Sequence, residues 1–309
     1  MPVSTGQASF MCCRQDSIVM EPARKLLRSV EIDNGTFTLT LHREDFSTLY
    51  PGMIRYELAV TSGGQTLDMF RTNTYEYSVP ESLAAETVAL MKADEWEHEL
   101  RASREGFLAA HHSGARPGRK ETQETADVVI IQGSPRPDGN CGILAAWAAD
   151  AAHTAGRTAR VIYPHDLDIH CCIGCYQCYN TGICIFDDDM AGIIDAIRGA
   201  SLLVVCSPVY TNTVPGSLKL LIDRTQAYHA ERALSGGRRG QSGLLLAVAG
   251  RTGGGNFTCV TRVISAFFEN LGIKPAGQIL LDRADAIRDI RTREGAEQQV
   301  KDAVRQCLT

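Results

Sequence analysis

Hydrophobic and polar positions follow two different patterns along the chain, and the pattern changes near residue 115. Before that point, the apolar residues of three short segments have the spacing and length of strands, and these segments are TFTLTLH (36–42), MIRYELAV (53–60) and QTLDMF (65–70). The turn Ser62-Gly63-Gly64 suits a hairpin between the second and third strands. One helix is expected to follow, from Glu81 to about Ala110.

Beyond residue 126, strand and helix patterns alternate. Val128–Gln132 is a short, fully apolar run, as expected of a parallel strand that is buried on both faces. Four more strands are expected at 159–163, 201–206, 243–249 and 277–281, and five helices at 141–155, 190–197, 216–228, 257–271 and 294–306. Strict alternation of this kind predicts a doubly wound α/β domain with a parallel sheet.

The two patterns divide the chain into an N-terminal α+β accessory region (1–115), a linker (116–126) and an α/β domain (127–309). The linker is expected because HHSGARPGRKETQE is polar and contains Gly and Pro. The strands and helix of the accessory region are few for an independent fold. Its role is open between a substrate lid, a dimerisation arm and a docking module.

Composition narrows the classes of partner. The net charge of -5 offers no electrostatic reason for binding nucleic acid or an anionic membrane. No apolar run reaches the length of a membrane span, and the N-terminus lacks the pattern of a signal peptide, so a cytoplasmic protein is expected. Five of the eleven cysteines fall between Cys171 and Cys184, which favours metal or redox chemistry over structural disulfides.

The first βα loop, GSPRPDGNC, has the chemistry of a phosphate site. Gly133 and Gly139 allow tight turns, Ser134 and Asn140 can donate hydrogen bonds, and Arg136 supplies a charge beside a helix N-terminus. The loop has neither the glycine pattern of a dinucleotide site nor the lysine of a Walker loop, so it suits a single terminal phosphate. An ordinary strand-to-helix turn is the alternative.

Two further loops fall at the same end of the predicted sheet. After the third strand, SPVYTNTVPGSLKLLIDR places Tyr210 where it can cover a planar ring, and the backbone of 209–213 where it can bond a pyrimidine edge. After the fourth, AGRTGGGNF contains three consecutive glycines that let backbone approach a ligand, with simple flexibility as the alternative. Ligands of such sheets bind beyond the carboxyl ends of the strands.

The motifs GSPRxxGN and SPVYxxxxPGxLKxxIDR and the glycine-rich fourth loop together resemble the NADPH-dependent FMN reductase family over residues 127 to about 282. The resemblance implies a flavodoxin-like sheet of order 2-1-3-4-5, an FMN cofactor, NAD(P)H as a donor, and a homodimer or homotetramer. The implied FMN residues are Ser134, Arg136, Asn140, Cys141, Pro208, Val209, Tyr210, Thr211, Asn212, Gly250, Gly253 and Gly254. Cys141 departs from the usual Ser or Thr, and a thiol is a weaker donor than a hydroxyl.

The cysteines of the second βα loop are spaced Cys172-x2-Cys175-x2-Cys178-x5-Cys184. Gaps of two residues let successive thiolates wrap around one small inorganic cluster. The spacing and the following DDM resemble the iron-sulfur flavoprotein branch of the same family, which implies a [4Fe-4S] cluster on these four cysteines. Three alternatives stay open, namely Cys171 as a ligand, a zinc site, and free thiols or a disulfide.

These features predict an FMN-dependent oxidoreductase that passes electrons between NAD(P)H, or a reduced protein donor, and an acceptor. No catalytic side chain is required, because the flavin carries the chemistry. Two other functions fit the same residues: an electron-transfer carrier or redox sensor without its own substrate, and a cluster-free NAD(P)H:FMN or quinone reductase.

Overall fold

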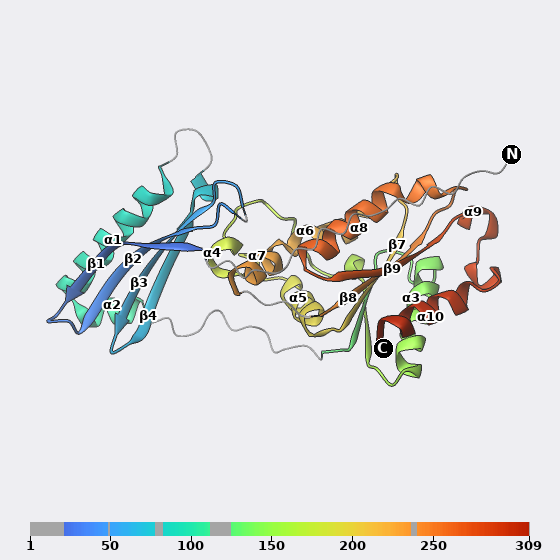
Figure 1. The fold of residues 1–309 in the computed structure, drawn as a ribbon, viewed down its shortest axis with the longest axis horizontal. Coiled ribbons are helices and arrows are strands. Elements are labelled where there is room, and N and C mark those ends of the chain that lie inside the picture. Colours follow the sequence, from blue (N-terminus) through green and yellow to red (C-terminus); the bar gives the residue numbers. More distant parts are fainter. Residues whose placement is uncertain (1–21, 49, 78–82, 112–124, 236–239, 309) are drawn as a thin grey trace.

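The structure is a computed structural model that describes residues 22–48, 50–77, 83–111, 125–235 and 240–308. Its strands form a four-stranded antiparallel sheet, β1-β2-β3-β4, and a five-stranded parallel sheet, β6-β5-β7-β8-β9 (Figure 1). Numbered from its own first strand, the parallel sheet has the order 2-1-3-4-5, so the predicted flavodoxin-like arrangement is confirmed. No described helix is long and apolar enough to cross a membrane.

The parallel sheet lies between two layers of helices. Its strands are β5 (Val128–Gln132), β6 (Ala159–Ile162), β7 (Leu202–Pro208), β8 (Ser242–Val248) and β9 (Lys274–Leu281). One layer contains α3 (Asn140–Thr154) and α10 (Ala296–Leu308), and the other α5 (Met190–Gly199), α6 (Gly216–Arg224) and α8 (Thr258–Asn270). Successive residues of β5 face opposite layers, because side chains alternate across a strand. This is why the run is apolar throughout.

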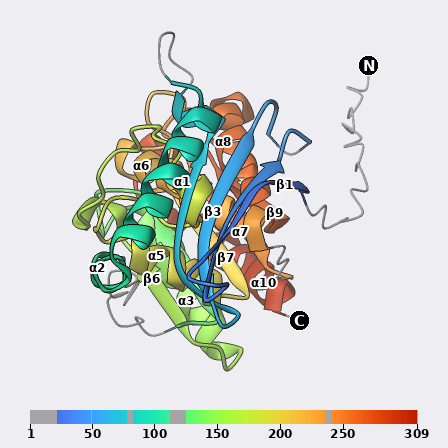
Figure 2. The same ribbon diagram turned by 90° about the vertical axis from the view of Figure 1, so that its left-hand side faces the viewer.

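The antiparallel sheet has helices on one face. It consists of β1 (Ala23–Ile32), β2 (Phe37–Asp45), β3 (Ile54–Ser62) and β4 (Gln65–Asn73), with α1 (Ala85–Ala102) and α2 (Arg104–Ala110) packed against it (Figure 2). Trp96 of α1 and Leu58 of β3 lie in the core between them. Gly63 and Gly64 both have positive φ, as a two-residue hairpin turn requires, so the predicted hairpin is confirmed.

Three element predictions were wrong in detail. The sequence predicts three N-terminal strands, but β1 is a fourth, an edge strand whose mostly exposed side chains give it no clear alternation. The single helix expected at 81–110 breaks at Ser103, whose side chain caps α2 by accepting from the N–H of Gly106 (3.1 Å). The helix expected at 216–228 divides at Thr225 into α6 and α7 (Gln226–Ser235).

Other boundaries differ by a few residues. The last parallel strand begins at Lys274 rather than residue 277, and the terminal helix spans 296–308 rather than 294–306. The predicted linker lies outside the described residues except for 125 and 126.

Candidate functional site

The three predicted flavin loops meet at one edge of the parallel sheet, beyond the carboxyl ends of β5, β7 and β8. The N–H of Gly133 donates to the carbonyl of Cys206 (2.8 Å), which joins the start of the first loop to β7. The N–H of Val209 donates to the carbonyl of Val248 (2.8 Å), which joins the second loop to the end of β8. This edge is where ligands of doubly wound sheets bind.

The first loop is shaped by its own residues. Gln132, fully buried at the end of β5, accepts from the N–H of Ser134 (2.6 Å) and donates to the carbonyl of Arg136 (3.1 Å). The hydroxyl oxygen of Ser134 accepts from the N–H of Arg136 (3.1 Å), and the Arg136 side chain is exposed. A Cβ at Gly142 would overlap the carbonyl oxygen of Pro137, because the loop folds back against the first turn of α3.

The first turn of α3 presents backbone N–H groups that have no carbonyl one turn earlier, which is the usual anion site of a helix N-terminus. The Asn140 side-chain oxygen accepts from the N–H of Ile290 (3.1 Å), so its amide nitrogen is the group left to meet a phosphate. The thiol of Cys141, already expected to be a weak donor, is buried in the core beneath α3, and burial raises its pKa to about 12. Cys141 therefore stays a predicted FMN residue through its backbone and not through its thiol.

The loop after β7 is a tight turn that exposes an aromatic ring. Tyr210 and Thr213 exchange two backbone hydrogen bonds of 2.9 Å around Thr211 and Asn212. Both central residues have positive φ, at 46° and 64°. A β-branched residue such as Thr rarely adopts this conformation, and such strain is concentrated at ligand-binding sites. Tyr210 is 41% exposed, as a ring that covers a planar ligand needs to be.

In the glycine-rich loop after β8, different constraints favour glycine at different positions. At Gly250 a Cβ would collide with the carboxylate of Asp285, so the requirement there is packing. Gly253 has a φ of 108°, and its N–H donates to the Asp282 side chain (2.9 Å). Gly253 and Gly254 both have open space on their Cβ side, which leaves room for a neighbour there, whereas Gly250 has none.

The four predicted cluster cysteines all lie between β6 and α5, in the segment that contains Cys178. Cys178 begins α4 (Cys178–Thr181), and positive φ angles at Gly174, Tyr176 and Gly182 provide the tight turns of the loop. Burial, and to a smaller extent the neighbouring charges of Cys184, Cys175 and Cys172, raise the pKa of Cys178 to about 12. In the described part of the chain, no three His, Cys, Asp or Glu side chains are already grouped as metal ligands.

Arg224 holds both ends of the cysteine loop. This buried last residue of α6 forms two hydrogen bonds with the carboxylate of Asp188 (2.6 and 3.0 Å) and donates to the carbonyl of His170 (2.7 Å). Burial opposes ionisation of Asp188, but the hydrogen bonds from Arg224 and from the backbone of His170 and Met190 outweigh it and lower the pKa of Asp188. Both charges of the pair are therefore maintained.

The same guanidinium suits a cluster of thiolates. Among the described residues, the buried Nε of Arg224 has no hydrogen-bond partner. Burial alone would lower the pKa of Arg224. The hydrogen bonds and negative charges of Asp188 and Cys184 outweigh burial, so the pKa of Arg224 is raised. A retained positive charge and a free donor beside Cys184 are what a negatively charged sulfur site needs. The donor set therefore fits an iron-sulfur cluster in its chemistry.

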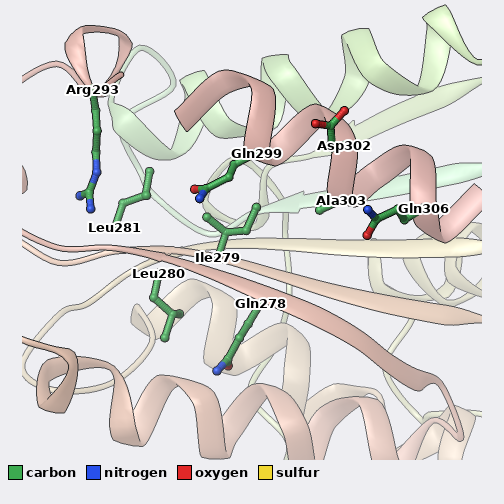
Figure 3. Close-up of a pocket in the computed structure, with 9 residues that line it drawn as sticks. All are labelled: Gln278, Ile279, Leu280, Leu281, Arg293, Gln299, Asp302, Ala303 and Gln306. Carbon is green, nitrogen blue, oxygen red and sulfur yellow. The ribbon is translucent and has the colours of Figure 1, made fainter. Parts of the chain in front are cut away.

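One hollow of the described surface lies elsewhere. A cavity of about 520 Å³ opens between β9 and α10, where Ile279 and Leu281 point toward α10 and Gln278 points away (Figure 3). None of the predicted site residues lines it. We therefore assign it no part in the candidate site.

The sequence did not predict a role for several residues of the site. Gln132 and Gly142 directly precede and follow the predicted phosphate loop, but neither was assigned a function. Arg224 ends the quoted IDR motif, and a charged residue at the end of an otherwise apolar helix face was the available signal. Asp188 begins the quoted DDM motif, four residues after Cys184, yet its partner is 36 residues away, which no local pattern reveals.

Comparison with known families matches residues 126–285 to the model of the NADPH-dependent FMN reductases, which is just over half of the chain. The chain belongs to the NADPH-dependent FMN reductase family. It is therefore a flavoprotein oxidoreductase, as predicted, and FMN is the cofactor of its family.

Relatives of this FMN reductase include iron-sulfur flavoproteins of archaea. It is 32% identical to one from Methanocaldococcus jannaschii over 140 residues, which cover 45% of this chain and 70% of the relative. It is 30% identical to another, from Methanosarcina thermophila, over 125 residues that cover 40% of this chain and 64% of that protein. These matches place the FMN reductase in the iron-sulfur flavoprotein branch that its cysteine spacing resembles.

Solved structures similar to this FMN reductase include an NAD(P)H:quinone oxidoreductase from Methanothermobacter marburgensis, at 17% identity and a TM-score of 0.47. The match covers 60% of this chain and 98% of that one.

Proposed function

We propose that this oxidoreductase binds FMN at the three loops and a [4Fe-4S] cluster at Cys172, Cys175, Cys178 and Cys184, and passes electrons between NAD(P)H or a reduced protein donor and an acceptor. When bound, FMN would exchange electrons in pairs or singly and the cluster would exchange them singly, so partners of both kinds could be served. The protein supplies the binding groups, their orientation and their charge.

One helix carries the proposal, because it connects both halves of the site. α6 begins at Gly216, directly after the turn that exposes Tyr210, and ends at Arg224, which holds the cysteine loop. A rigid helix between the two loops keeps them at a constant separation. This shared support favours electron exchange between groups bound at the two loops.

On the flavin side, the N–H groups of the first turn of α3 would bind the phosphate, with Ser134, Asn140 and Arg136 beside them. Tyr210 would cover the planar ring of FMN, and Gly253 and Gly254 would let the backbone of the loop after β8 approach that ring. On the cluster side, Arg224 would donate toward the sulfur atoms near Cys184.

Anaerobic purification with FMN, iron and sulfide analysis tests the proposal. We expect one FMN and about four iron and four sulfide per chain, as the cluster formula requires. Cys178→Ala should lose most of the iron and keep the FMN, whereas Cys307→Ala, a partly buried thiol of α10, should keep both. Protein without FMN would refute the whole proposal. Full FMN with negligible iron and sulfide would identify a cluster-free reductase.

Turnover separates an enzyme from a carrier. Steady-state oxidation of NAD(P)H with a quinone as acceptor is expected of an enzyme, whereas a carrier would only exchange electrons with a reduced protein. Light scattering of the same sample tests the homodimer or homotetramer that the resemblance implies.

A further inference from the structure

The N-terminal sheet contacts the cysteine loop of its own chain through the segment that carries Cys178. In Figure 1, α4 lies between the antiparallel sheet and the helices of the parallel sheet. Residues 22–111 are outside the part matched by the FMN reductase family, so the family does not account for this contact. The contact has a polar part and an apolar part, and both involve residues next to Cys178.

The polar part centres on Glu76, which follows β4. One carboxylate oxygen of Glu76 accepts from the side chain of Gln177 (2.7 Å), and the other accepts from the side-chain amide of Asn180. The side-chain amide of Asn73 donates to Glu76 (2.8 Å) and to the Asn180 oxygen (2.8 Å). Asn180 is almost fully buried, so these bonds are shielded from water. The bonded residues lie on both sides of Cys178 in the sequence.

Two arginines of the N-terminal sheet cap α4 from its C-terminal side. A helix this short leaves its last carbonyls without intrahelical partners. Arg71 donates to the carbonyl of Asn180 (3.2 Å), and Arg55 donates to the carbonyl of Tyr179 (3.4 Å). Each arginine is held in turn by a carboxylate on the neighbouring strand, Arg55 by Glu44 (2.7 Å) and Arg71 by Glu57 (2.8 Å).

The apolar part covers the thiol itself. Phe46 and Met53 of the N-terminal region pack with Tyr179 and Ala230, and Cys178 lies against this cluster. The ring of Tyr50 meets that of Tyr179 edge to face, with centroids 4.8 Å apart. The N-terminal region is therefore part of the reason that Cys178 is partly buried while Cys172 is exposed.

We propose that residues 22–77 act as a clamp that positions the Cys178 segment and shields its thiol, with Glu76 as the principal positioning residue. This assigns the accessory region a role as a docking module for its own cysteine loop. The proposal rests on the proposed function only for the identity of what Cys178 binds. The clamp itself follows from the contacts.

The test uses the full chain after chelator treatment and follows alkylation of each cysteine by iodoacetamide with peptide mass spectrometry. Glu76→Ala removes the acceptor of Gln177 and Asn180, and should speed alkylation of Cys178 at least tenfold. Glu76→Gln keeps an acceptor toward Asn180 and should restore most of the protection. Glu97→Ala is the matched control. Glu97 lies on α1 and pairs with Arg28 of β1 and Arg101 of α1, so its removal breaks ion pairs of the N-terminal region that do not involve the cysteine loop. It should leave Cys178 within twofold of the unaltered chain.

Two internal references separate positioning from general stability. Cys141 and Cys206 are buried in the core of the parallel sheet, and their alkylation should not change in any variant. A Cys178 rate in Glu76→Ala within twofold of the unaltered chain would overturn the clamp. If Cys141, Cys178 and Cys206 all react faster in Glu76→Ala, the variant Arg71→Gln distinguishes the two explanations, because it removes only the hydrogen bond to the carbonyl of Asn180. Selective exposure of Cys178 in that variant supports the clamp, and an unchanged rate overturns it.

The same variants can be reconstituted with iron and sulfide. The clamp predicts that Glu76→Ala takes up a cluster whose visible absorbance decays several-fold faster in air than that of Glu97→Ala, and equal decay counts against it. Failure of the unaltered chain to take up iron and sulfide would refute the proposed cluster. It would not affect the clamp, which the alkylation rates test independently.

Discussion

The phosphate loop and the cysteine loop lie at the same edge of the parallel sheet, but they are held in different ways. Gln132 and Ser134 shape the phosphate loop through hydrogen bonds to residues no more than four positions away. The cysteine loop depends on distant residues, since Arg224 binds Asp188 across 36 residues and Glu76 binds Asn180 across 104. The turn of the phosphate loop is thus set mainly by nearby residues, although Gly133 and Asn140 also bond residues far along the chain, whereas the cysteine loop is held chiefly by tertiary contacts.

This difference predicts that the two halves respond separately to mutation. Changes in the phosphate loop should alter FMN affinity and leave the cysteine loop intact. Changes far along the chain should disturb the cysteine loop and leave FMN in place. The following substitutions examine this separation.

Arg224→Met should have the largest effect. It leaves the Asp188 carboxylate buried without its partner, and breaking a buried ion pair costs about 3–5 kcal/mol of the free energy of unfolding. Urea denaturation measures this loss, and iron analysis should show that most of the cluster is lost as well. Lys219→Met on the same helix removes only an exposed pair with Asp223 and should cost less than about 0.5 kcal/mol.

The pH dependence of the same variant has a definite sign. The folded-state pKa of Asp188 is lowered from its ordinary value of 3.8, so the stabilisation by its pair with Arg224 is present above that value. It is lost as the pH falls through the folded-state pKa. The difference in stability between Arg224→Met and the unaltered chain should therefore be largest near pH 7 and shrink as the pH falls into acid. A difference that persists there would contradict the role given to the ion pair.

Gly142→Ala should weaken FMN binding at least about tenfold, which corresponds to ~1.4 kcal/mol. The new methyl group would overlap the Pro137 carbonyl oxygen, so the phosphate loop must move. Fluorescence titration with FMN measures the affinity. Gly255→Ala, where the added group meets open space, should change it less than threefold. Loss of iron in Gly142→Ala would show that the two halves of the site are not separate.

Tyr210→Ala should reduce FMN affinity by about five- to tenfold, close to the ~1 kcal/mol typical of an aromatic stacking contact. The exposed ring supports little else, so thermal stability should be unchanged. Ile185→Ala, at another exposed apolar residue, which lies next to Cys184, is the control and should leave FMN titration unaltered. Equal effects of the two variants would argue against a ring-covering role for Tyr210.

Cys141→Ala should have the smallest effect on FMN. Its thiol lies in the core, so affinity should stay within twofold, while the free energy of unfolding falls by about 1 kcal/mol for the lost packing. FMN titration and urea denaturation of one preparation give both values. A tenfold loss of affinity would mean that the thiol reaches the phosphate after all.

Much of the fold was predictable, because the strongest signals are local. The run Val128–Gln132 became a strand with the bounds expected, and the order of the parallel sheet followed from the family motifs. The Gly63-Gly64 hairpin was predictable because positive φ at two adjacent residues favours glycine. The break at Ser103 and the edge strand β1 were missed, because each depends on packing more than on periodicity.

The residues of the chain alone determined which loops carry chemistry, since glycine, serine and cysteine at short spacings restrict what a backbone and its donors can bind. Tertiary structure alone decided which way the side chains of these loops face and what holds them. It turned the Cys141 thiol into the core, placed Arg224 across the ends of the cysteine loop, and brought Glu76 to Asn180. Periodicity reports local geometry, whereas a buried charge finds its partner only after the chain has folded.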